Sequence, residues 1–398
     1  MLIQFTLKNF LSFKDETILD MTAISAYKEH EYNLMDIGTK EKYLRVAAIY
    51  GANASGKSNL YFSFKTFQRI ILESLNNVAN EELNAIERYY LPFLFDSEKN
   101  NTEFEIIINV NSFEYKYGFE YNDKKIVNEW MYKKNIETNR NTIIFERDHT
   151  GLIQFGASIR KECIQYGEQI PKETLILSFF NKLKLKTKVY NEVYNGIMDT
   201  FALDTDFYEK SVILDKILPK IIDSDKENLL KFLMAIDTGI KDIWYKVDNG
   251  EKRFFTRHDD AEDNHYNLPL YNESKGTIKS IAIYTHAVLA VEKNGCLFID
   301  ELNAKLHPLL LKFIIDLFYN QSSQAQLIYT THDTTLLDKK FFRRDQIWFV
   351  QKDYMGHSEL IALSDFKVRS DASFEKDYLA GVYGGIPLLK EFSLREGE

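Results

Sequence analysis

Apolar and polar residues alternate with two different periods in the first part of the chain. Residues 2–10 and Thr17–Met21 alternate with a period of two, which predicts two short strands. The apolar run 45–50 predicts a third strand that ends at Gly51, and apolar residues recur at helical spacing from Asn59 to about Asn76. A strand, a loop and a helix are therefore expected around Gly51.

The pattern changes twice in the middle of the chain. A period of two predicts antiparallel strands in four segments, Phe104–Val110, Glu114–Tyr121, Ile126–Tyr132 and Ile143–Glu146. Apolar residues three and four positions apart then predict four helices, Leu175–Leu185, Val189–Phe201, Ser211–Leu218 and Glu227–Ile236. We expect a β-layer followed by an inserted helical subdomain punctuated by Pro171 and Pro219, and we interpret Arg257–Asp263 as a solvated turn.

The last third of the chain has the helix–strand alternation that is typical of a parallel sheet. Helices are expected at Ile278–Val291 and Leu309–Tyr319, and strands at Gly295–Ile299, Gln326–Thr331 and Gln346–Gln351. The predicted fold class is α/β, with a mixed sheet, an antiparallel β-layer and an inserted helical subdomain. The predicted division is an N-terminal lobe at 1–150, a helical insertion at 151–265 and a C-terminal lobe at 266–398.

The loop after the third strand carries the clearest chemical signal. Residues 51–58 read GANASGKS and fit the phosphate-loop pattern G-x-x-x-x-G-K-[ST] at every fixed position. Glycines let backbone N–H groups surround phosphate oxygens, and the following helix adds the positive end of its dipole. We expect Lys57 to neutralise the β- and γ-phosphates of ATP and Ser58 to bind Mg²⁺. The candidate nucleotide-binding residues here are Gly51, Asn53, Ala54, Ser55, Gly56, Lys57, Ser58 and Asn59.

A plain strand-to-helix turn is the alternative interpretation of this loop. The apolar strand before it and the helical pattern after it favour the phosphate loop.

A second signal lies at the end of the apolar strand that begins at Gly295, where Asp300 and Glu301 follow directly. A buried parallel strand presents its last side chains at the carboxyl edge of the sheet, where ligands bind in open α/β folds. Asp300 is expected to bind Mg²⁺, and Glu301 to act as general base for the attacking water. Alone, a strand that ends in two acids is weak evidence for a magnesium and catalytic site. Together with a phosphate loop in the same chain it becomes strong evidence.

Two further positions are candidates because of where they stand. His332 closes the strand 326–331 and is expected to sense the γ-phosphate, although a lone histidine at a strand end is more often structural. Asp333 either joins it or caps the next helix. Ser274 and Gly276 begin the helix that leads to Asp300, and alone they are an ordinary helix start.

Composition limits the class of protein. The chain has 398 residues, 45% of them hydrophobic and 27% charged, which indicates a folded domain and not a disordered one. Its net charge of −9 excludes a strongly basic whole-chain surface for nucleic acid. Lys182, Lys184, Lys186 and Lys188 form a local basic run, for which a solvated face is the favoured interpretation.

Cysteine content and hydropathy bear on the compartment. The two cysteines, Cys163 and Cys296, cannot build a disulfide framework or a metal-ligand pattern. The first ten residues read as a strand and not as a signal peptide, and no apolar stretch reaches the ~20 residues of a membrane span. We expect a cytoplasmic protein that does not associate with a membrane.

The order of these motifs resembles that of ABC-type ATPase heads. A phosphate loop near residue 50, Ser-x-Gly at Ser274–Gly276, an apolar strand ending in Asp300-Glu301 and then Thr331-His332 follow one another in the same order. The segment FTLKNFLSF at residues 5–13 is similar to the first strand of the SMC and RecF-like branch, and Glu301–Pro308 to its D-loop. The tail Tyr378–Pro387 resembles the AAA family ATPases of abortive-infection and anti-phage systems, such as the ATPase subunit of PARIS-type systems.

This resemblance implies a P-loop ATPase that acts as a homodimer or a higher homo-oligomer. Two copies would enclose two ATP molecules, and Ser274 and Gly276 of one copy would contact the γ-phosphate held by the other. The signature ESKGT at Glu273–Thr277 departs from the Leu-Ser-Gly-Gly-Gln of transporters. No Q-loop glutamine can be placed, and the candidates Gln154, Gln165 and Gln169 lack a strand-end context.

Three hypotheses of function follow. In the first, the chain is an ATPase that controls a separate toxin or nuclease effector, because the segment after His332 has no acidic pattern at nuclease spacing. In the second, it is a RecF-like DNA repair ATPase that binds nucleic acid. In the third, it is an ATP-gated scaffold in which assembly is the function.

Overall fold

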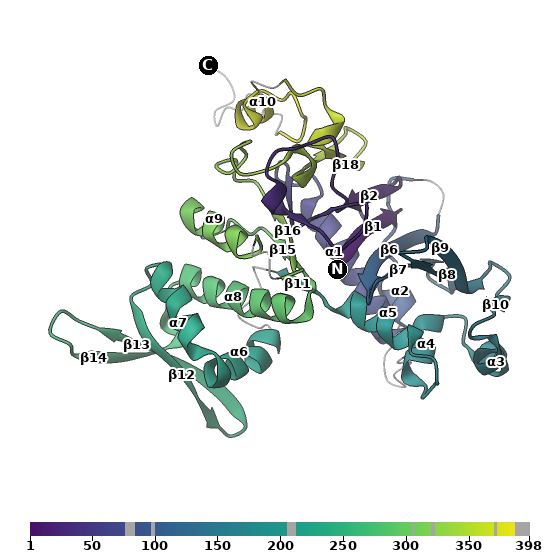
Figure 1. The fold of residues 1–398 in the computed structure, drawn as a ribbon, viewed down its shortest axis with the longest axis horizontal. Coiled ribbons are helices and arrows are strands. Elements are labelled where there is room, and N and C mark those ends of the chain that lie inside the picture. The colour runs from purple at the N-terminus through teal and green to yellow at the C-terminus, as the bar shows by residue number, and fades with distance from the viewer. Residues whose placement is uncertain are drawn as a thin grey trace, which may run out of the picture.

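A seven-stranded antiparallel sheet forms one side of the molecule (Figure 1). The computed structural model describes residues 1–75, 84–96, 100–204, 212–304, 306–319, 323–369 and 372–386. Side chains of the central strands alternate between buried and partly exposed, as a sheet with one covered face requires. In sheet order the strands are β10 (Ile153–Phe155), β9 (Arg140–Arg147), β8 (Ile126–Asn135), β7 (Phe113–Tyr121), β6 (Thr102–Val110), β1 (Leu2–Lys8) and β2 (Thr17–Asp20). The predicted N-terminal strands and the predicted β-layer are therefore confirmed, and they belong to one sheet.

A six-stranded sheet forms the centre of the molecule. Its first five strands are parallel, and an antiparallel strand closes one edge. These parallel strands are almost continuously apolar because both faces are covered. In sheet order they are β11 (Thr200–Asp204), β15 (Cys296–Asp300), β16 (Gln326–Thr331), β5 (Val46–Tyr50), β17 (Ile347–Lys352) and β18 (Ser358–Ala362).

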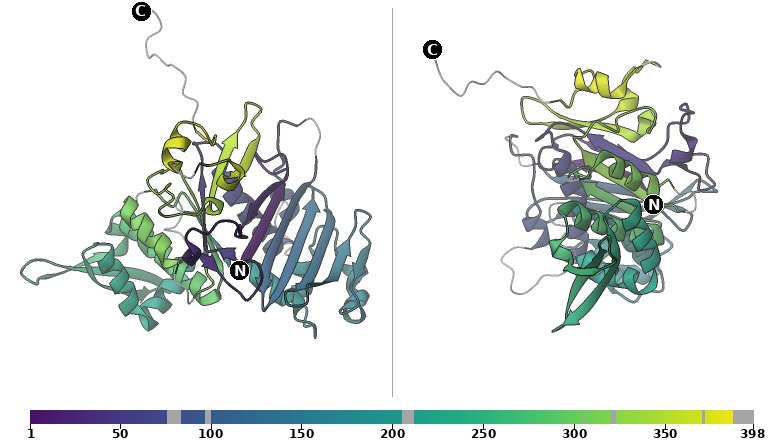
Figure 2. Two further views of the ribbon diagram at one scale, coloured as in Figure 1. Left: turned by 45° about the horizontal axis from the view of Figure 1, so that its top comes forward. Right: turned by 90° about the vertical axis from the view of Figure 1, so that its left-hand side faces the viewer.

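The two faces of the six-stranded sheet pack into different cores. Ala47, Ile49 and Phe298 face one core, which also holds α1 (Lys57–Glu73) and the inner face of the seven-stranded sheet. Val46, Ala48 and Leu297 face the other core, which holds α8 (Lys275–Lys293) and α9 (Pro308–Leu317). The helices α1 and α8 therefore lie on opposite faces of the parallel sheet. In the left view of Figure 2, the seven-stranded sheet lies on the right and the green helices within residues 275–317 lie to its left.

The middle of the chain differs from the predicted helical subdomain. The helices α3 (Arg160–Cys163), α4 (Ile176–Lys182) and α5 (Val189–Met198) are followed by β11, which pairs with β15 in the central sheet. After α6 (Val212–Ser224) and α7 (Lys226–Ala235), the chain forms a three-stranded sheet from β12 (Ile240–Asp248), β13 (Glu251–Asp259) and β14 (His265–Pro269). We call this sheet the arm, and it extends to the left in Figure 1.

Two details of the middle segment correct the prediction. Pro219 lies inside α6 and does not end it, and residues 257–259 belong to β13, so that only the segment from Asp260 onward turns. The helices were predicted, but the strands of the arm were not, because most of their side chains are partly or fully exposed and lack the alternation of apolar residues by which a strand is recognised. The domain limits at 150 and 265 stay a prediction.

Buried polar side chains join distant parts of the chain. Gln326 of β16 accepts the backbone N–H of Leu2 at 2.7 Å and donates to the Leu44 carbonyl at 3.1 Å, so it ties the two sheets together. Fully buried Arg343 pairs with Asp345 at 2.8 Å and donates to the Glu29 carbonyl at 2.8 Å. The remaining short elements are β3 (Leu34–Met35), β4 (Tyr43–Leu44), α2 (Ala85–Arg88) and α10 (Phe374–Leu379).

The basic run lies on the surface of the molecule. The side chains of Lys182, Lys184, Lys186 and Lys188 are all exposed, along the connection between α4 and α5. Leu183 and Leu185, which alternate with them, pack against the first core. Among the described residues, the helices are each too short or too polar to cross a membrane.

Candidate nucleotide-binding site

The loop between β5 and α1 has the backbone conformation that a phosphate loop requires. Gly56 has φ 116°, and a side-chain carbon there would lie 2.9 Å from the Ser12 hydroxyl. A side-chain carbon at Gly51 would lie 2.6 Å from the Val350 carbonyl oxygen. Glycine fits at both positions because other atoms approach closely at each, and at Gly56 the positive φ also opposes a Cβ.

Polar groups at this loop are arranged for an anion. The Lys57 ammonium is buried and donates to the carbonyls of Gly51 and Ala52, each at 2.8 Å. The Ser55 hydroxyl is also buried, and no described residue hydrogen-bonds to it. A buried hydroxyl without a partner is costly, and a phosphate oxygen is a partner of the required kind. Ser58, in the first turn of α1, is half-buried, whereas Asn53 and Ala54 are exposed.

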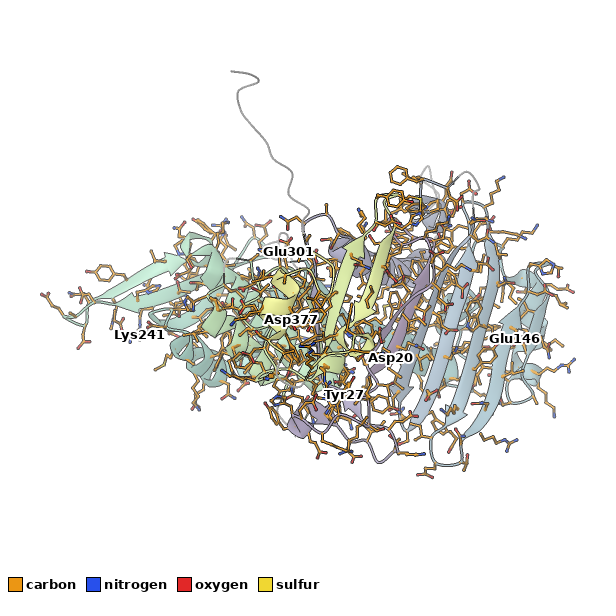
Figure 3. The ribbon with its side chains drawn as sticks, turned by 90° about the horizontal axis from the view of Figure 1, so that it is seen from above. Asp20, Tyr27, Glu146, Lys241, Glu301 and Asp377 are labelled. Atoms are coloured by element: carbon orange, nitrogen blue, oxygen red, sulfur yellow. The ribbon has the colours of Figure 1, made fainter. Side chains whose placement is uncertain are left out.

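The strand order brings the acidic pair to the same edge of the sheet. Strand β16 lies between β15 and β5, so that Ile299 pairs with Tyr329 and Thr331 pairs with Tyr50. Asp300 and Glu301 therefore leave the sheet at the edge where the phosphate loop begins. Burial lowers the pKa of Lys57, while the charges of Asp300 and Glu301 act in the opposite direction. Figure 3 places Glu301 between the arm, marked by Lys241, and the seven-stranded sheet, marked by Glu146.

Thr330 holds the acidic pair in place. Its hydroxyl donates to Asp300 Oδ1 at 2.5 Å and accepts the backbone N–H of Glu301 at 2.8 Å. Glu301 itself has φ 51°, which costs about 1–3 kcal/mol for a residue with a side chain, so its conformation needs such support. Thr330 was not among the residues predicted from the sequence, although its place in the run Thr330-Thr331-His332 at a strand end was a signal.

Replacing Thr330 by Val should slow ATP turnover about tenfold and leave ATP binding unchanged. Valine has nearly the same shape but removes the hydroxyl that donates to Asp300 and accepts the N–H of Glu301, at a cost of about 1–3 kcal/mol. Steady-state phosphate release and equilibrium nucleotide binding measure the two effects. Thr102→Val is the control, because Thr102 is equally buried and donates to the Asn9 carbonyl in the other sheet. Equal turnover of both variants would contradict the role of Thr330.

His332 lies at the same edge and contacts a residue of the segment after Glu301. Its Nε2 is 3.3 Å from the side-chain nitrogen of Asn303, and Asn303 is mostly buried. Asn303 was not among the residues predicted from the sequence, although it lies in the D-loop-like segment. Asp333 accepts the backbone N–H of Thr335 at 2.8 Å in a turn, so it does not cap a helix.

Ser274 and Gly276 lie at the start of α8. Ser274 is exposed and caps α8, accepting the N–H of Thr277 at 3.0 Å, and Gly276 is half-buried in the first turn. The helices α8 and α1 cover opposite faces of the sheet, so Ser274 and the phosphate loop adjoin helices of different faces.

The side chain of Asn59 is hydrogen-bonded within the protein. Its amide donates to the Ser12 hydroxyl at 2.7 Å. The hydroxyl of Ser358 in β18 lies 2.7 Å from that of Ser12 and donates to the Ser55 carbonyl at 2.6 Å. Ser12 and Ser358, which the sequence analysis did not single out, thus hold the phosphate loop from outside.

The candidate Q-loop glutamines lie elsewhere. Gln154 is in β10, at the opposite edge of the seven-stranded sheet from β2. Gln165 and Gln169 lie in the short helix η2 (Ile164–Gln169), where the Gln169 amide donates to the Gln165 carbonyl at 3.1 Å. The position of a Q-loop glutamine stays open.

A phosphate loop after β5 and an acidic strand end on β15, with β16 between the two strands, define a P-loop nucleoside triphosphatase fold. The family described as "AAA domain, putative AbiEii toxin, Type IV TA system" matches residues 46–338, which is more than half of the chain, so the chain belongs to this family. No curated protein matches the chain.

Solved structures of SMC heads resemble the chain over most of its length. An SMC head bound to the C-winged helix domain of ScpA is 14% identical, with a TM-score of 0.46, and the match covers 94% of this chain and 99% of that one. The SMC head domain from Thermotoga maritima is 13% identical, with a TM-score of 0.39, and covers 91% and 98%. An SMC head with an extended coiled coil, bound to the C-terminal domain of ScpA from Pyrococcus furiosus, is 13% identical, with a TM-score of 0.43, and covers 95% and 98%.

Proposed function

We propose that this chain hydrolyses ATP at a site shared between two copies and that the nucleotide state controls a separate effector protein. The observation that carries the proposal is the split of the candidate residues. Lys57, Ser58, Asp300, Glu301 and His332 meet at one edge of the parallel sheet, whereas Ser274 is exposed on the helix that covers the opposite face.

The phosphate loop binds and orients the triphosphate. Backbone N–H groups of residues 51–56 and the Ser55 hydroxyl donate to its oxygens, and the Lys57 ammonium moves from the Gly51 and Ala52 carbonyls to the β- and γ-phosphates. The half-buried Ser58 hydroxyl and the Asp300 carboxylate are hard oxygen donors that suit Mg²⁺. Mg²⁺ held there would neutralise charge on the β- and γ-phosphates.

Glu301 activates the water. Its carboxylate accepts a proton while the water oxygen forms a bond to the γ-phosphorus, and the bond from that phosphorus to the β–γ bridging oxygen breaks to leave ADP and phosphate. His332 donates a hydrogen bond to the γ-phosphate. The backbone N–H groups at the start of α8 and the Ser274 hydroxyl of the second copy complete the set of donors.

The effector role rests on the family. Its description names a toxin and a type IV toxin–antitoxin system, which supports control of a toxin by this ATPase. In the proposal, ATP closes the dimer and hydrolysis reopens it, so that the effector is held in one state and released in the other.

Mixing two inactive variants tests the shared site. Lys57→Ala, in the first variant, removes the phosphate contact of its own site. Ser274→Arg, in the second variant, blocks the contact that its copy makes with the nucleotide of the partner copy. A mixed dimer retains one intact site, so we expect the mixture to recover about a quarter of the parent turnover, since half of the dimers are mixed and each has one of two sites. Phosphate release after subunit exchange is the measurement.

Lys57→Ala mixed with Glu301→Gln is the matched control, because both residues would serve the same copy's site and mixing leaves both sites damaged. Asn84→Arg, which changes the residue that caps α2, controls for an arginine at a helix cap. A Lys57→Ala and Ser274→Arg mixture that stays as inactive as its components would contradict the shared site.

A DNA-bound function remains a second candidate because the exposed run Lys182–Lys188 offers a local positive surface. It requires DNA binding that weakens steeply with salt and DNA-stimulated ATP turnover. Neutralising the four lysines would then abolish both.

A further inference from the structure

A fully buried lysine lies in α8, five residues after its cap Ser274. The Lys279 ammonium donates to the Glu301 carbonyl at 2.9 Å and to the Ala304 carbonyl at 2.7 Å. Burying a charged ammonium costs several kcal/mol unless hydrogen bonds compensate. An apolar side chain would fill the same space without this cost, so packing alone does not explain a lysine here.

These bonds act on the peptide that carries Glu301. The residue has a positive φ of 51°, and its N–H is held by Thr330 of β16 at 2.8 Å. Its carbonyl accepts from Lys279 and also from the N–H of Ala304 at 3.1 Å. The main chain on both sides of the Glu301 Cα is therefore fixed, from β16 on one side and from α8 on the other.

We propose that Lys279 is a positioning residue that aims the Glu301 carboxylate and transmits contacts at the start of α8 to it. This inference rests on the proposed function, since it assumes that Glu301 activates water and that Ser274 contacts the nucleotide of the second copy. Ser274 and Lys279 are about 7.5 Å apart along the helix axis, so a small movement of the first turn of α8 reaches Glu301 through a single side chain. ATP held by one copy would thus adjust the base that serves the other ATP.

Lys279→Met tests the positioning role in the full-length protein. Methionine fills a similar volume without a charge, and we expect kcat to fall about a hundredfold with the Kd for ATP unchanged, because small misplacements of a catalytic group have effects of this size. Lys279→Arg keeps the cation and should recover most of kcat. A kcat within twofold of the parent in Lys279→Met would overturn the proposal.

Arg343→Met is the matched control for the loss of a buried cation. Arg343 is also fully buried and donates to the carbonyls of Tyr27 and Glu29, but it precedes β17 at the amino edge of the sheet, away from the site. Its loss should lower the melting temperature and leave kcat unchanged. If Lys279→Met does not fold, Lys279→Gln takes its place: the shorter amide can serve one carbonyl, and we expect kcat to fall about tenfold, whereas unchanged kcat would again overturn the proposal.

A double-mutant cycle tests the transmission from Ser274. If Ser274 acts through Lys279, the loss of kcat in the double variant Ser274→Ala, Lys279→Met should be smaller than the product of the two single losses. Losses that multiply would overturn the transmission. Failure of the proposed function looks different, because turnover by the parent would then not depend on Lys57 or Glu301 at all.

Discussion

Replacing Glu301 by Gln should lower ATP turnover about 10²–10⁴-fold while ATP binding is retained, because the amide keeps the shape of the side chain but cannot accept the proton of water. The backbone supports of Glu301, from Thr330 and Lys279, use its N–H and carbonyl and are unaffected by the substitution. Single-turnover phosphate release and equilibrium binding of a fluorescent ATP analogue separate the two effects. The variant should also accumulate as an ATP-bound dimer, which light scattering detects.

Glu146→Gln is the control for this experiment. Glu146 accepts the Tyr132 hydroxyl at 2.6 Å in the seven-stranded sheet, far from Glu301 in Figure 3, and its replacement should leave turnover unchanged. Turnover of Glu301→Gln within a few-fold of the parent would remove Glu301 from the role of general base.

Gly56→Ala should weaken ATP binding about a hundredfold or more. The new Cβ requires φ 116° from a residue with a side chain, and it would meet the hydroxyls of Ser358 and Ser12. Strain of about 1–3 kcal/mol, with the steric clash added, displaces the loop and therefore the N–H groups that bind phosphate. Isothermal titration with a non-hydrolysable ATP analogue measures the loss.

Gly151→Ala is the control, because it introduces backbone strain without a steric clash. Gly151 also has a positive φ, of 89°, but a side-chain carbon there meets no atom within 4 Å and lies in the turn before β10. It should lower stability slightly and leave ATP binding intact. If Gly56→Ala binds ATP as Gly151→Ala does, the close packing around Gly56 has no part in nucleotide binding.

The chemistry-bearing elements could be predicted because each is a buried strand followed at once by its polar residues. Strand 326–331 was predicted with its observed limits, and the helix after the phosphate loop begins two residues earlier than its apolar pattern, at Lys57. A local period and an adjacent motif are both contained in a short stretch of sequence. The arm was missed since nearly all side chains of β13 and β14 are partly or fully exposed and polar residues interrupt any apolar stripe.

The supporting residues could not be predicted for a different reason. Thr330, Lys279 and Ser358 act on Asp300, Glu301 and Ser55, from which they are separated by 22 or more residues in the chain. Their role exists only after strands and helices have packed. A lysine inside an apolar helix pattern or a serine in an edge strand has no local feature that distinguishes it.

The sequence by itself determined the phosphate loop, the acidic strand end and the alternation of elements, because spacing and period are local properties of the chain. Only the tertiary structure decided that β16 separates β15 from β5 and that α1 and α8 cover opposite faces of one sheet. Strand order depends on long-range burial of apolar faces, which no short window contains. That order gathers Lys57, Asp300, Glu301 and His332 at one edge and leaves Ser274 exposed on the other face of the sheet.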